Sequence, residues 1–470
     1  MKIIIVGAGR VGSSVAEALV SEANDITVID TDVGRVAELQ ERFDLRGLVG
    51  NAALPSVLQQ AGAEDADMLI AVTAGDEINL VACKIAADLY NIPTRIARVR
   101  NVELQQHPAL IGEGGFRASH VIFPEQTVTD YLLKLIEFPE ALQVLEFADG
   151  RASLIAVRAF AGGPLVSHPI KDLRRHIPNV DTRIVAIFRN DASVRVDGDT
   201  FVQPGDEVFF LAASQDIRRV LGELRRMDKP VRRVIIAGGG NIGLRLARAL
   251  DTGEGLDIAE RFNVRIIESN KRRAEVLARQ LSSEVLVLQG DATDEDLLTQ
   301  EGVQDADLFV ALTNDDENNI MSSLLAKRLG ARRVIALINR KSYGDLMQGG
   351  QIDIAVSPSY ATLSALLRFV RRGDVVAAHS LRRGAAEALE LIVHGDEKSS
   401  RIIGKPIEQI ELPRGATIGA VVRGSADRTQ VLMAHHDVVV QAEDHLIVFV
   451  ENKRIIPRVE KLFSVGLGFF

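Results

Sequence analysis

Two glycine triplets are the residues most suited to holding a phosphate group. Each has the spacing Gly-x-Gly-x-x-Gly, follows a short apolar run and precedes a helical pattern. The triplets are Gly7, Gly9 and Gly12, and Gly238, Gly240 and Gly243. The first glycine allows a tight turn, the second lets backbone N–H groups approach a phosphate, and the third lets the helix pack on the strand. The helix N-terminus then favours an anion, so the spacing predicts two nucleotide-phosphate sites.

An acidic residue follows each triplet at the end of the next predicted strand. Asp30 closes the run Val28-Ile29-Asp30, and Glu268 closes Ile266-Ile267-Glu268. A carboxylate in this place accepts hydrogen bonds from ribose hydroxyls and repels a 2′-phosphate. The pattern therefore favours NAD or NADH over NADPH. The alternative is that the glycines serve strand–helix packing alone.

The residues inside the two glycine loops differ in charge. The first loop holds Arg10 and Val11, and the second holds Asn241 and Ile242. An arginine inside a phosphate loop can bind phosphate oxygens bidentately, and an asparagine carries no charge with which to do so. The two sites are therefore expected to differ in preferred nucleotide or in affinity.

Further candidates come at the ends of later predicted strands. Asn51 with Ala52, and Asp291 with Ala292, follow a glycine after a short apolar run. Their side chains are expected near the adenine, where they could accept from its amine, or in a turn-stabilising role. Thr73 and Thr313 end the next strand beside the same crevice, because ligands collect at the carboxyl ends of parallel strands. The alternative for the two threonines is helix N-capping.

These landmarks recur in the same order, so the chain contains an internal repeat. The first glycines lie 231 positions apart (238 − 7), and Thr73 and Thr313 lie 240 apart (313 − 73). Each copy opens with alternating apolar strands and helices and ends with short strands between turn signals. The expected fold is α/β, with two tandem Rossmann-like, doubly wound parallel-sheet domains, each followed by a small α+β domain. The predicted domains are 1–140, 141–228, 229–375 and 376–470.

Composition excludes several classes of function. The 470 residues are 47% hydrophobic and 25% charged, as in a globular protein, and the net charge of −9 argues against nucleic-acid binding. A single cysteine, Cys83, cannot form an intramolecular disulfide, and in an alanine-rich helix it is expected to be a small core residue. No cluster of cysteine and histidine predicts a metal site. The apolar run Met1–Val6 is far too short to span a bilayer, so a membrane role is expected to require a partner.

The duplicated fingerprint, the Gly-Asn-Ala and Gly-Asp-Ala turns and the two small strand-rich domains resemble the TrkA family, the cytoplasmic NAD-binding subunits of Trk potassium-uptake systems. The resemblance covers almost the whole chain. It implies that each half is an RCK domain, a regulator of potassium conductance. It further implies a ring-forming homo-oligomer on the inner face of the cell membrane, beneath a TrkH-like potassium-transporting subunit. Bound NAD, NADH, ATP or ADP would alter ring shape and ion flux.

Two other functions are weighed against this reading. An NAD-dependent dehydrogenase needs a positioned acid or base in a substrate lobe, and no convincing His, Lys or Tyr group stands outside the repeats. A nucleotide-dependent regulator of another transporter has the same sequence features. We therefore expect a non-catalytic regulatory protein.

Overall fold

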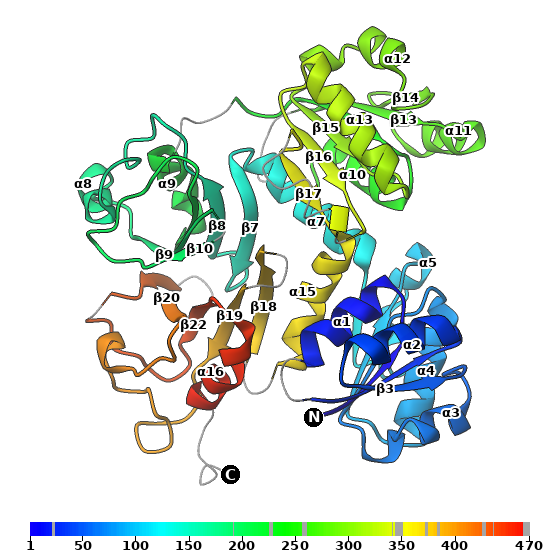
Figure 1. Ribbon diagram of the computed structural model, residues 1–470, viewed down its shortest axis with the longest axis horizontal. Coiled ribbons are helices and arrows are strands. Elements are labelled where there is room, and N and C mark those ends of the chain that lie inside the picture. Colours follow the sequence, from blue (N-terminus) through cyan, green and yellow to red (C-terminus); the bar gives the residue numbers. More distant parts are fainter. Residues whose placement is uncertain are drawn as a thin grey trace. The chain divides into compact units, whose positions relative to one another are not determined.

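The first sheet is built from buried apolar runs, as expected of parallel strands that are covered on both faces. The computed structural model describes residues 1–20, 24–190, 192–224, 229–255, 261–340, 342–343, 351–371, 375–382, 386–424, 429–435 and 437–463. All strand pairs of the first sheet are parallel, in the order β3-β2-β1-β4-β5-β6. Figure 1 draws this domain in blue to cyan. Its strands are β1 (Lys2–Val6), β2 (Asp25–Asp30), β3 (Arg46–Val49), β4 (Met68–Ala71), β5 (Thr94–Arg98) and β6 (His120–Ile122).

Helices connect these strands and cover the sheet. The helices are α1 (Arg10–Val20), α2 (Val33–Arg42), α3 (Pro55–Gln60), α4 (Asp76–Asp88), α5 (Val102–Gln105) and α6 (Pro108–Ile111), with the short 3-10 turn η1 (Ala63–Asp65). Helix α7 (Pro124–Glu137) follows the last strand, β6. The strand order reverses between β1 and β4, which creates a crevice at the carboxyl ends of the strands.

The second parallel sheet repeats this order as β14-β13-β12-β15-β16-β17. Its strands are β12 (Arg233–Ala237), β13 (Asn263–Glu268), β14 (Leu286–Gln289), β15 (Leu308–Ala311), β16 (Val334–Leu337) and β17 (Ile354–Val356). Its helices are α10 (Asn241–Thr252), α11 (Lys271–Gln280), α12 (Glu295–Gln300), η4 (Val303–Asp305) and α13 (Asp316–Leu329), and α15 (Pro358–Val370) follows the last strand, β17. The prediction of two tandem doubly wound domains is confirmed.

Each half also contains a small antiparallel sheet, which confirms the predicted α+β domains. The first has the order β10-β9-β11-β8-β7 and the second β18-β19-β22-β20-β21. The first lobe comprises β7 (Ala141–Phe147), β8 (Ala152–Arg158), η2 (Ile170–Asp172), α8 (Leu173–His176), β9 (Thr182–Arg189), β10 (Ala192–Val194), β11 (Glu207–Ala213), η3 (Ser214–Asp216) and α9 (Ile217–Leu224). The second comprises β18 (Val375–Leu381), β19 (Ala386–Ile392), η6 (Ile407–Gln409), β20 (Ala416–Arg423), β21 (Gln430–Met433), β22 (His445–Val450), η8 (Lys453–Ile455) and α16 (Ile456–Phe463).

The two small sheets share one hydrophobic core. Phe147 and Phe209 of the first lobe pack in the same buried cluster as Phe449 of the second. Gly419 in β20 lies so close to the first lobe that a Cβ there would approach Leu211 Cδ1 to 2.2 Å. The two lobes therefore form one sandwich made from both halves of the chain.

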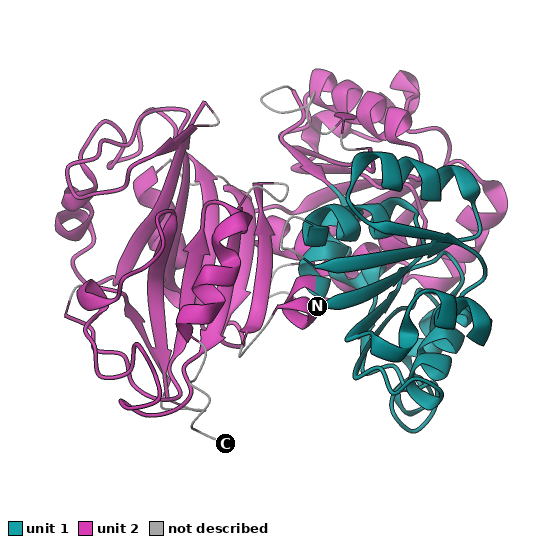
Figure 2. Ribbon diagram, turned by 60° about the horizontal axis from the view of Figure 1, so that its bottom comes forward, with its two compact units in different colours: residues 1–128, 357–366 teal, residues 129–356, 367–470 magenta. Residues whose placement is uncertain are grey.

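The two compact units of the structure do not follow the order of the sequence. One compact unit comprises Met1–Val128 with Ser357–Leu366, and the other comprises Thr129–Val356 with Leu367–Phe470 (Figure 2). The beginning of α15, which follows the second parallel sheet in sequence, thus belongs with the first. The boundaries that we predict at 140, 228 and 375 follow chain order and stay predictions.

Within the second unit, the end of α7 is held to the second parallel sheet. The Arg333 guanidinium, one residue before β16, donates to the carbonyls of Leu135 and Ala141.

Among the described residues, no helix is both long and apolar enough to cross a membrane.

Candidate nucleotide-binding sites

The first glycine loop has the geometry expected of a phosphate loop. Gly7 adopts φ +106°, which L side chains rarely adopt, and its N–H donates to the Ile29 carbonyl at 2.7 Å. A Cβ on Gly12 would lie 1.8 Å from the Gly7 carbonyl oxygen. A Cβ on Gly9 would meet nothing within 4 Å. The turn and the close helix–strand packing are thus present, and open space remains beside the middle glycine.

The second loop repeats this geometry. Gly238 has φ +103°, and its N–H donates to the Ile267 carbonyl at 2.9 Å. A Cβ on Gly243 would lie 2.0 Å from the Gly238 oxygen, while one on Gly240 would meet nothing within 4 Å. Both loops therefore offer room for a ligand at the N-terminus of a helix.

The two acidic residues tie each glycine loop to the neighbouring strand. Asp30 Oδ2 accepts from Ala8 N at 2.6 Å, and its Oδ1 accepts from Asp32 N at 2.9 Å. Glu268 accepts in the same way from Gly239 N at 2.9 Å and from Asn270 N at 2.8 Å. A carboxylate has about four acceptor positions, so each retains capacity for a ribose hydroxyl. The contact to ribose stays a prediction.

Asn51 and Asp291 stabilise turns. Asn51 Oδ1 accepts from Ala53 N at 2.9 Å, and Asp291 Oδ1 accepts from Thr293 N at 2.9 Å. Ala52 beside the first turn is buried. The turn-stabilising role is therefore present in both copies, and the contact to adenine stays a prediction.

Thr73 and Thr313 do not cap helices, so the capping alternative is wrong. The N-cap residue of α4 is Gly75, and that of α13 is Asp315. Each threonine hydroxyl instead lies 2.7 Å from the side-chain oxygen of a fully buried asparagine, Asn79 or Asn319. The carbonyl of each threonine accepts from the same asparagine amide, which locks the ends of β4 and β15.

The loop residues Arg10 and Asn241 begin α1 and α10, and both side chains are exposed. Val11 is buried and Ile242 half-buried beside them. The difference in charge that distinguishes the two copies is therefore placed at the helix N-terminus, where it would act on a bound phosphate.

Sequence reasoning missed a second arginine at the carboxyl ends of the strands of the first sheet, Arg98. It ends β5, and its carbonyl accepts from Asn79 Nδ2, which also donates to the Thr73 carbonyl. Burial, with a smaller contribution from the charge of Arg100, lowers the pKa of Arg98 below its ordinary value, and the carboxylates of Glu125 and Asp76 oppose this shift. Within the described part of the chain, its guanidinium has no hydrogen-bond partner. A partly buried arginine without a partner is suited to binding an anion.

The repeat itself contains a signal that points to Arg98. Ala97 and Ala336 pair with the equivalent residues Ala71 and Ala311, so Arg98 corresponds to Leu337. The first crevice thus differs from the second at two basic positions, Arg10 and Arg98. Comparison of the two copies strand by strand would have found Arg98.

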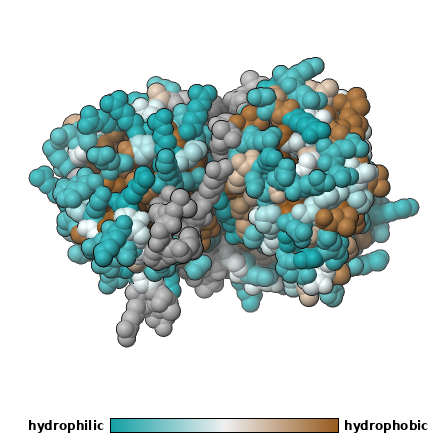
Figure 3. Space-filling model, turned by 90° about the horizontal axis from the view of Figure 1, so that it is seen from below, coloured by the Kyte–Doolittle hydropathy of each residue, from teal (hydrophilic) through white to brown (hydrophobic). Residues whose placement is uncertain are grey.

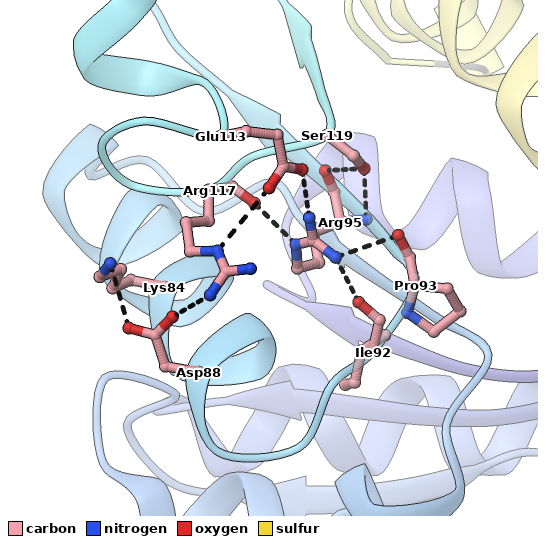
Figure 4. A network of polar contacts seen from close by, with 8 residues as sticks. All are labelled: Lys84, Asp88, Ile92, Pro93, Arg95, Glu113, Arg117 and Ser119. Atoms are coloured by element: carbon pink, nitrogen blue, oxygen red, sulfur yellow. Dashed lines mark hydrogen bonds and ion pairs between the residues drawn. The ribbon is translucent and has the colours of Figure 1, made fainter.

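A polar network fixes the opposite end of the strand that carries Arg98 (Figure 4). Arg95 is 7% exposed, and its guanidinium binds the carbonyls of Ile92 and Arg117 and the carboxylate of Glu113. Arg117 in turn forms an ion pair with Asp88 at the end of α4. The network therefore ties β5 to α4 and to the loop before β6.

Cys83 is a buried core residue in α4, as expected. Burial raises the pKa of its thiol to about 12, so it is un-ionised at neutral pH. Among the described residues, no group of three or more His, Cys, Asp or Glu side chains is arranged to hold a metal ion.

Comparison with known families matches both kinds of domain twice. The TrkA-N domain model matches residues 3–124 and 234–358, and the TrkA-C domain model matches residues 154–225 and 397–464. The matches fall on the two parallel sheets and on the two small lobes.

Relatives match over the full length of the chain. The Trk system potassium uptake protein TrkA of Halomonas elongata is 53% identical over 470 residues, which is 100% of both chains. The protein of the same name from Vibrio alginolyticus is 50% identical and covers 99% of each chain. More distantly, a TrkA homolog of Archaeoglobus fulgidus is 32% identical over 98% of this chain and 100% of its own.

Solved structures confirm the fold. The RCK domain of GsuK aligns over 98% of this chain and 94% of its own, with a TM-score of 0.59 and 17% identity. The GsuK channel bound to NAD aligns over 98% of this chain and 78% of its own, with a TM-score of 0.59 and 18% identity. The two halves therefore have the RCK fold.

Proposed function

The chain belongs to the TrkA family, and from this premise we propose that it is a nucleotide-binding regulatory subunit of a potassium-uptake system. The observation that carries the proposal is the duplicated loop in which both middle glycines, Gly9 and Gly240, border open space at a helix N-terminus. A side chain at either position would fill the place where a phosphate is expected.

The proposed ligands are adenine nucleotides: NAD or NADH, and ATP or ADP. Asp30 and Glu268 would bind the ribose, and the N–H groups of the glycine loops would bind the phosphates. Arg10 and Arg98 would add two cations at the phosphate end of the first crevice, which favours a more highly charged phosphate chain there. The likeness to a channel bound to NAD supports the choice of ligand class.

The proposed partner is a TrkH-like potassium-transporting subunit, with this chain in a cytoplasmic ring on the inner face of the membrane. The names of the relatives support a role in potassium uptake. Apolar side chains are exposed on the equivalent helices α4 and α13, where Leu89 at the end of α4 and Met321 of α13 are each 59% exposed. Figure 3 shows hydrophobic patches between hydrophilic residues on one face of the molecule.

The nucleotide would act by stabilising one arrangement of the domains over another. A ligand shifts such an equilibrium only by its differential affinity for the two arrangements. Chemical turnover of the nucleotide is not part of the proposal. Both small lobes are used in one shared sandwich, so the described residues include no separate substrate lobe of the kind a dehydrogenase needs.

The variant Asp30→Ala tests this function. It should weaken binding of ADP and NADH to the first crevice about 10-fold or more, because hydrogen bonds to a charged group contribute about 1.5–3 kcal/mol. Calorimetry measures the affinity, and potassium uptake by cells that carry the membrane subunit measures the regulation.

Asp67→Ala is the matched control for this experiment. Asp67 also accepts a backbone N–H, from Lys2, but it lies at the amino ends of the central strands β1 and β4, whereas Asp30 lies at the carboxyl end of β2. Its loss should leave nucleotide affinity and the uptake response unchanged. If Asp30→Ala behaves like Asp67→Ala in both measurements, the proposed role of the first crevice is wrong.

A further inference from the structure

Two arginines at equivalent positions make different contacts in the two copies. Arg35 in α2 and Arg273 in α11 each come five residues after the acidic residue of their crevice. Arg35 Nε lies 3.5 Å from Asp32 Oδ2, in an exposed ion pair. Arg273 Nε instead donates to the carbonyl of Gly239 at 2.7 Å. The second arginine thus lies against the glycine loop and the first does not.

The residue that caps each helix explains the difference. Asp32, the N-cap of α2, accepts from Gly34 N and Arg35 N and carries a negative charge that attracts Arg35. Asn270, the N-cap of α11, accepts from Arg273 N and is neutral. Because Asn270 cannot form an ion pair, it leaves the Arg273 guanidinium to bind the loop.

The surroundings of Arg273 are those of a ligand-binding residue. Its side chain is half-buried, and beyond the Nε contact its guanidinium has no partner in the part of the chain that the structure describes. The carboxylate of the crevice, Glu268, already accepts from Gly239 N and Asn270 N. The two remaining Nη groups match the spacing of two phosphate oxygens.

The loop is also shaped to bring α11 close. A Cβ on Gly239 would approach Leu277 Cδ1 of α11 to 2.2 Å, whereas the equivalent residue of the first loop is Ala8. The absence of a side chain at Gly239 therefore lets α11, with Arg273, pack directly against the loop.

We propose that Arg273 is the anion-binding residue of the second crevice and binds a phosphate group on the adenosine part of the nucleotide. This assignment rests on the proposed function of that crevice. It gives the second crevice a cation that replaces Arg10 and Arg98, whose equivalents are Asn241 and Leu337. The two crevices would then hold phosphate from opposite sides: the first from α1 and β5, the second from α11.

Calorimetry on the full-length chain tests the assignment. The second crevice is measured in an Asp30→Ala background, with ADP and adenosine as ligands. Adding Arg273→Gln should weaken ADP binding 10-fold or more and change adenosine binding less than about 2-fold, because only ADP carries phosphate. Arg35→Gln in a Glu268→Ala background is the matched control and should change ADP binding to the first crevice less than about 2-fold.

Comparison of ADP with 2′,5′-ADP identifies which phosphate is bound. If Arg273→Gln loses more affinity for 2′,5′-ADP than for ADP, the arginine binds the 2′-phosphate. If it loses the same affinity for both ligands, the arginine binds the 5′-phosphates. Normal binding of both ADP and 2′,5′-ADP by Arg273→Gln would overturn the assignment of Arg273 alone. Failure of the Asp30→Ala parent to bind ADP would overturn both this assignment and the proposed role of the second crevice.

Exchanging the two N-cap residues tests why Arg35 and Arg273 make different contacts, without removing either arginine. Asn270→Asp should draw Arg273 into the ion pair seen in the first copy and weaken ADP binding as Arg273→Gln does. Asp32→Asn should release Arg35 and strengthen ADP binding to the first crevice in the Glu268→Ala background. Unchanged ADP affinity in both exchanges would contradict the explanation from the N-cap, and unchanged thermal unfolding shows that the variants fold.

Discussion

Individual glycines of the nucleotide loops have separable roles. Gly12 permits α1 to pack closely against the glycine loop, because a side chain at this position would collide with the Gly7 oxygen. Gly9 borders open space, so packing does not require the lack of a side chain there, and the proposed nucleotide does. Stability and binding should therefore respond to different substitutions within the same loop.

At this scale we predict opposite outcomes for two alanine substitutions. Gly12→Ala should destabilise the protein by about 2 kcal/mol or more, because the loop or α1 must move to admit a methyl group. Gly9→Ala should change the free energy of unfolding by less than about 1 kcal/mol and weaken nucleotide binding. Urea denaturation and calorimetry measure the two quantities. Normal stability of Gly12→Ala would contradict the close approach that the structure shows.

Between elements, the contact of β18 with β7 contains a titratable group. His379 in β18 lies edge-on to the Phe147 ring, with ring centroids 5.0 Å apart, and its Nε2 is 3.3 Å from the Glu146 carbonyl oxygen. Burial lowers the pKa of His379 to about 4, and the carbonyl of Glu146 opposes this shift. The neutral ring is therefore part of the sandwich between the small lobes.

This burial predicts a pH dependence of stability. The unfolded chain protonates His379 near its ordinary pKa of about 6.5, while the folded chain does so near 4. Folding thus gains its full contribution from the neutral ring above pH 6.5, and this contribution falls as the pH drops from 6.5 to about 4. Because the ring is half-buried, we expect a loss of about 2 kcal/mol.

The measurement is the difference in unfolding free energy between the parent and His379→Gln at pH 7 and pH 4.5. The parent should lose more stability than the variant over this interval. His107→Gln, in which an exposed histidine is replaced, is the control and should lose as much as the parent. Equal losses in all three proteins would show that burial in the sandwich does not lower the pKa of His379.

At the scale of the whole molecule, the two halves of the chain depend on each other. The cluster that contains Phe147, Phe209 and Phe449 belongs to both small lobes, and Ser357–Leu366 of the second half groups with Met1–Val128. Separating the halves would expose apolar surface on each, at a cost of about 25 cal/mol for every Å².

We therefore predict that residues 1–228 and 229–470, expressed as separate chains, associate when produced together and aggregate when produced alone. Copurification of the untagged half with a tagged one, followed by size-exclusion chromatography, measures the association. Gly419→Leu should weaken it, because a side chain there collides with Leu211. Two stable, monomeric halves would contradict the shared core.

Much of the fold could be predicted from the sequence, because the repeated glycine spacing and apolar runs are local signals. A turn at Gly7 or Gly238 requires positive φ whatever lies far away, and a strand buried on both faces must be apolar along its length. The turns at Asn51 and Asp291 are equally local, since each side chain binds a backbone N–H two residues on. The two crevices and their candidate residues were predictable for this reason.

What the sequence by itself determined is therefore two tandem Rossmann-like domains, each with a glycine loop and a carboxylate. Only the tertiary structure decided how Thr73 bonds to Asn79 and that the Arg98 guanidinium has no hydrogen-bond partner among the described residues. It also decided that Arg273 donates to the glycine loop and that the small lobes share a core. These features depend on which distant groups come into contact and on which charges are already paired. Such contacts arise from the packing of whole elements, so no local spacing of residues encodes them.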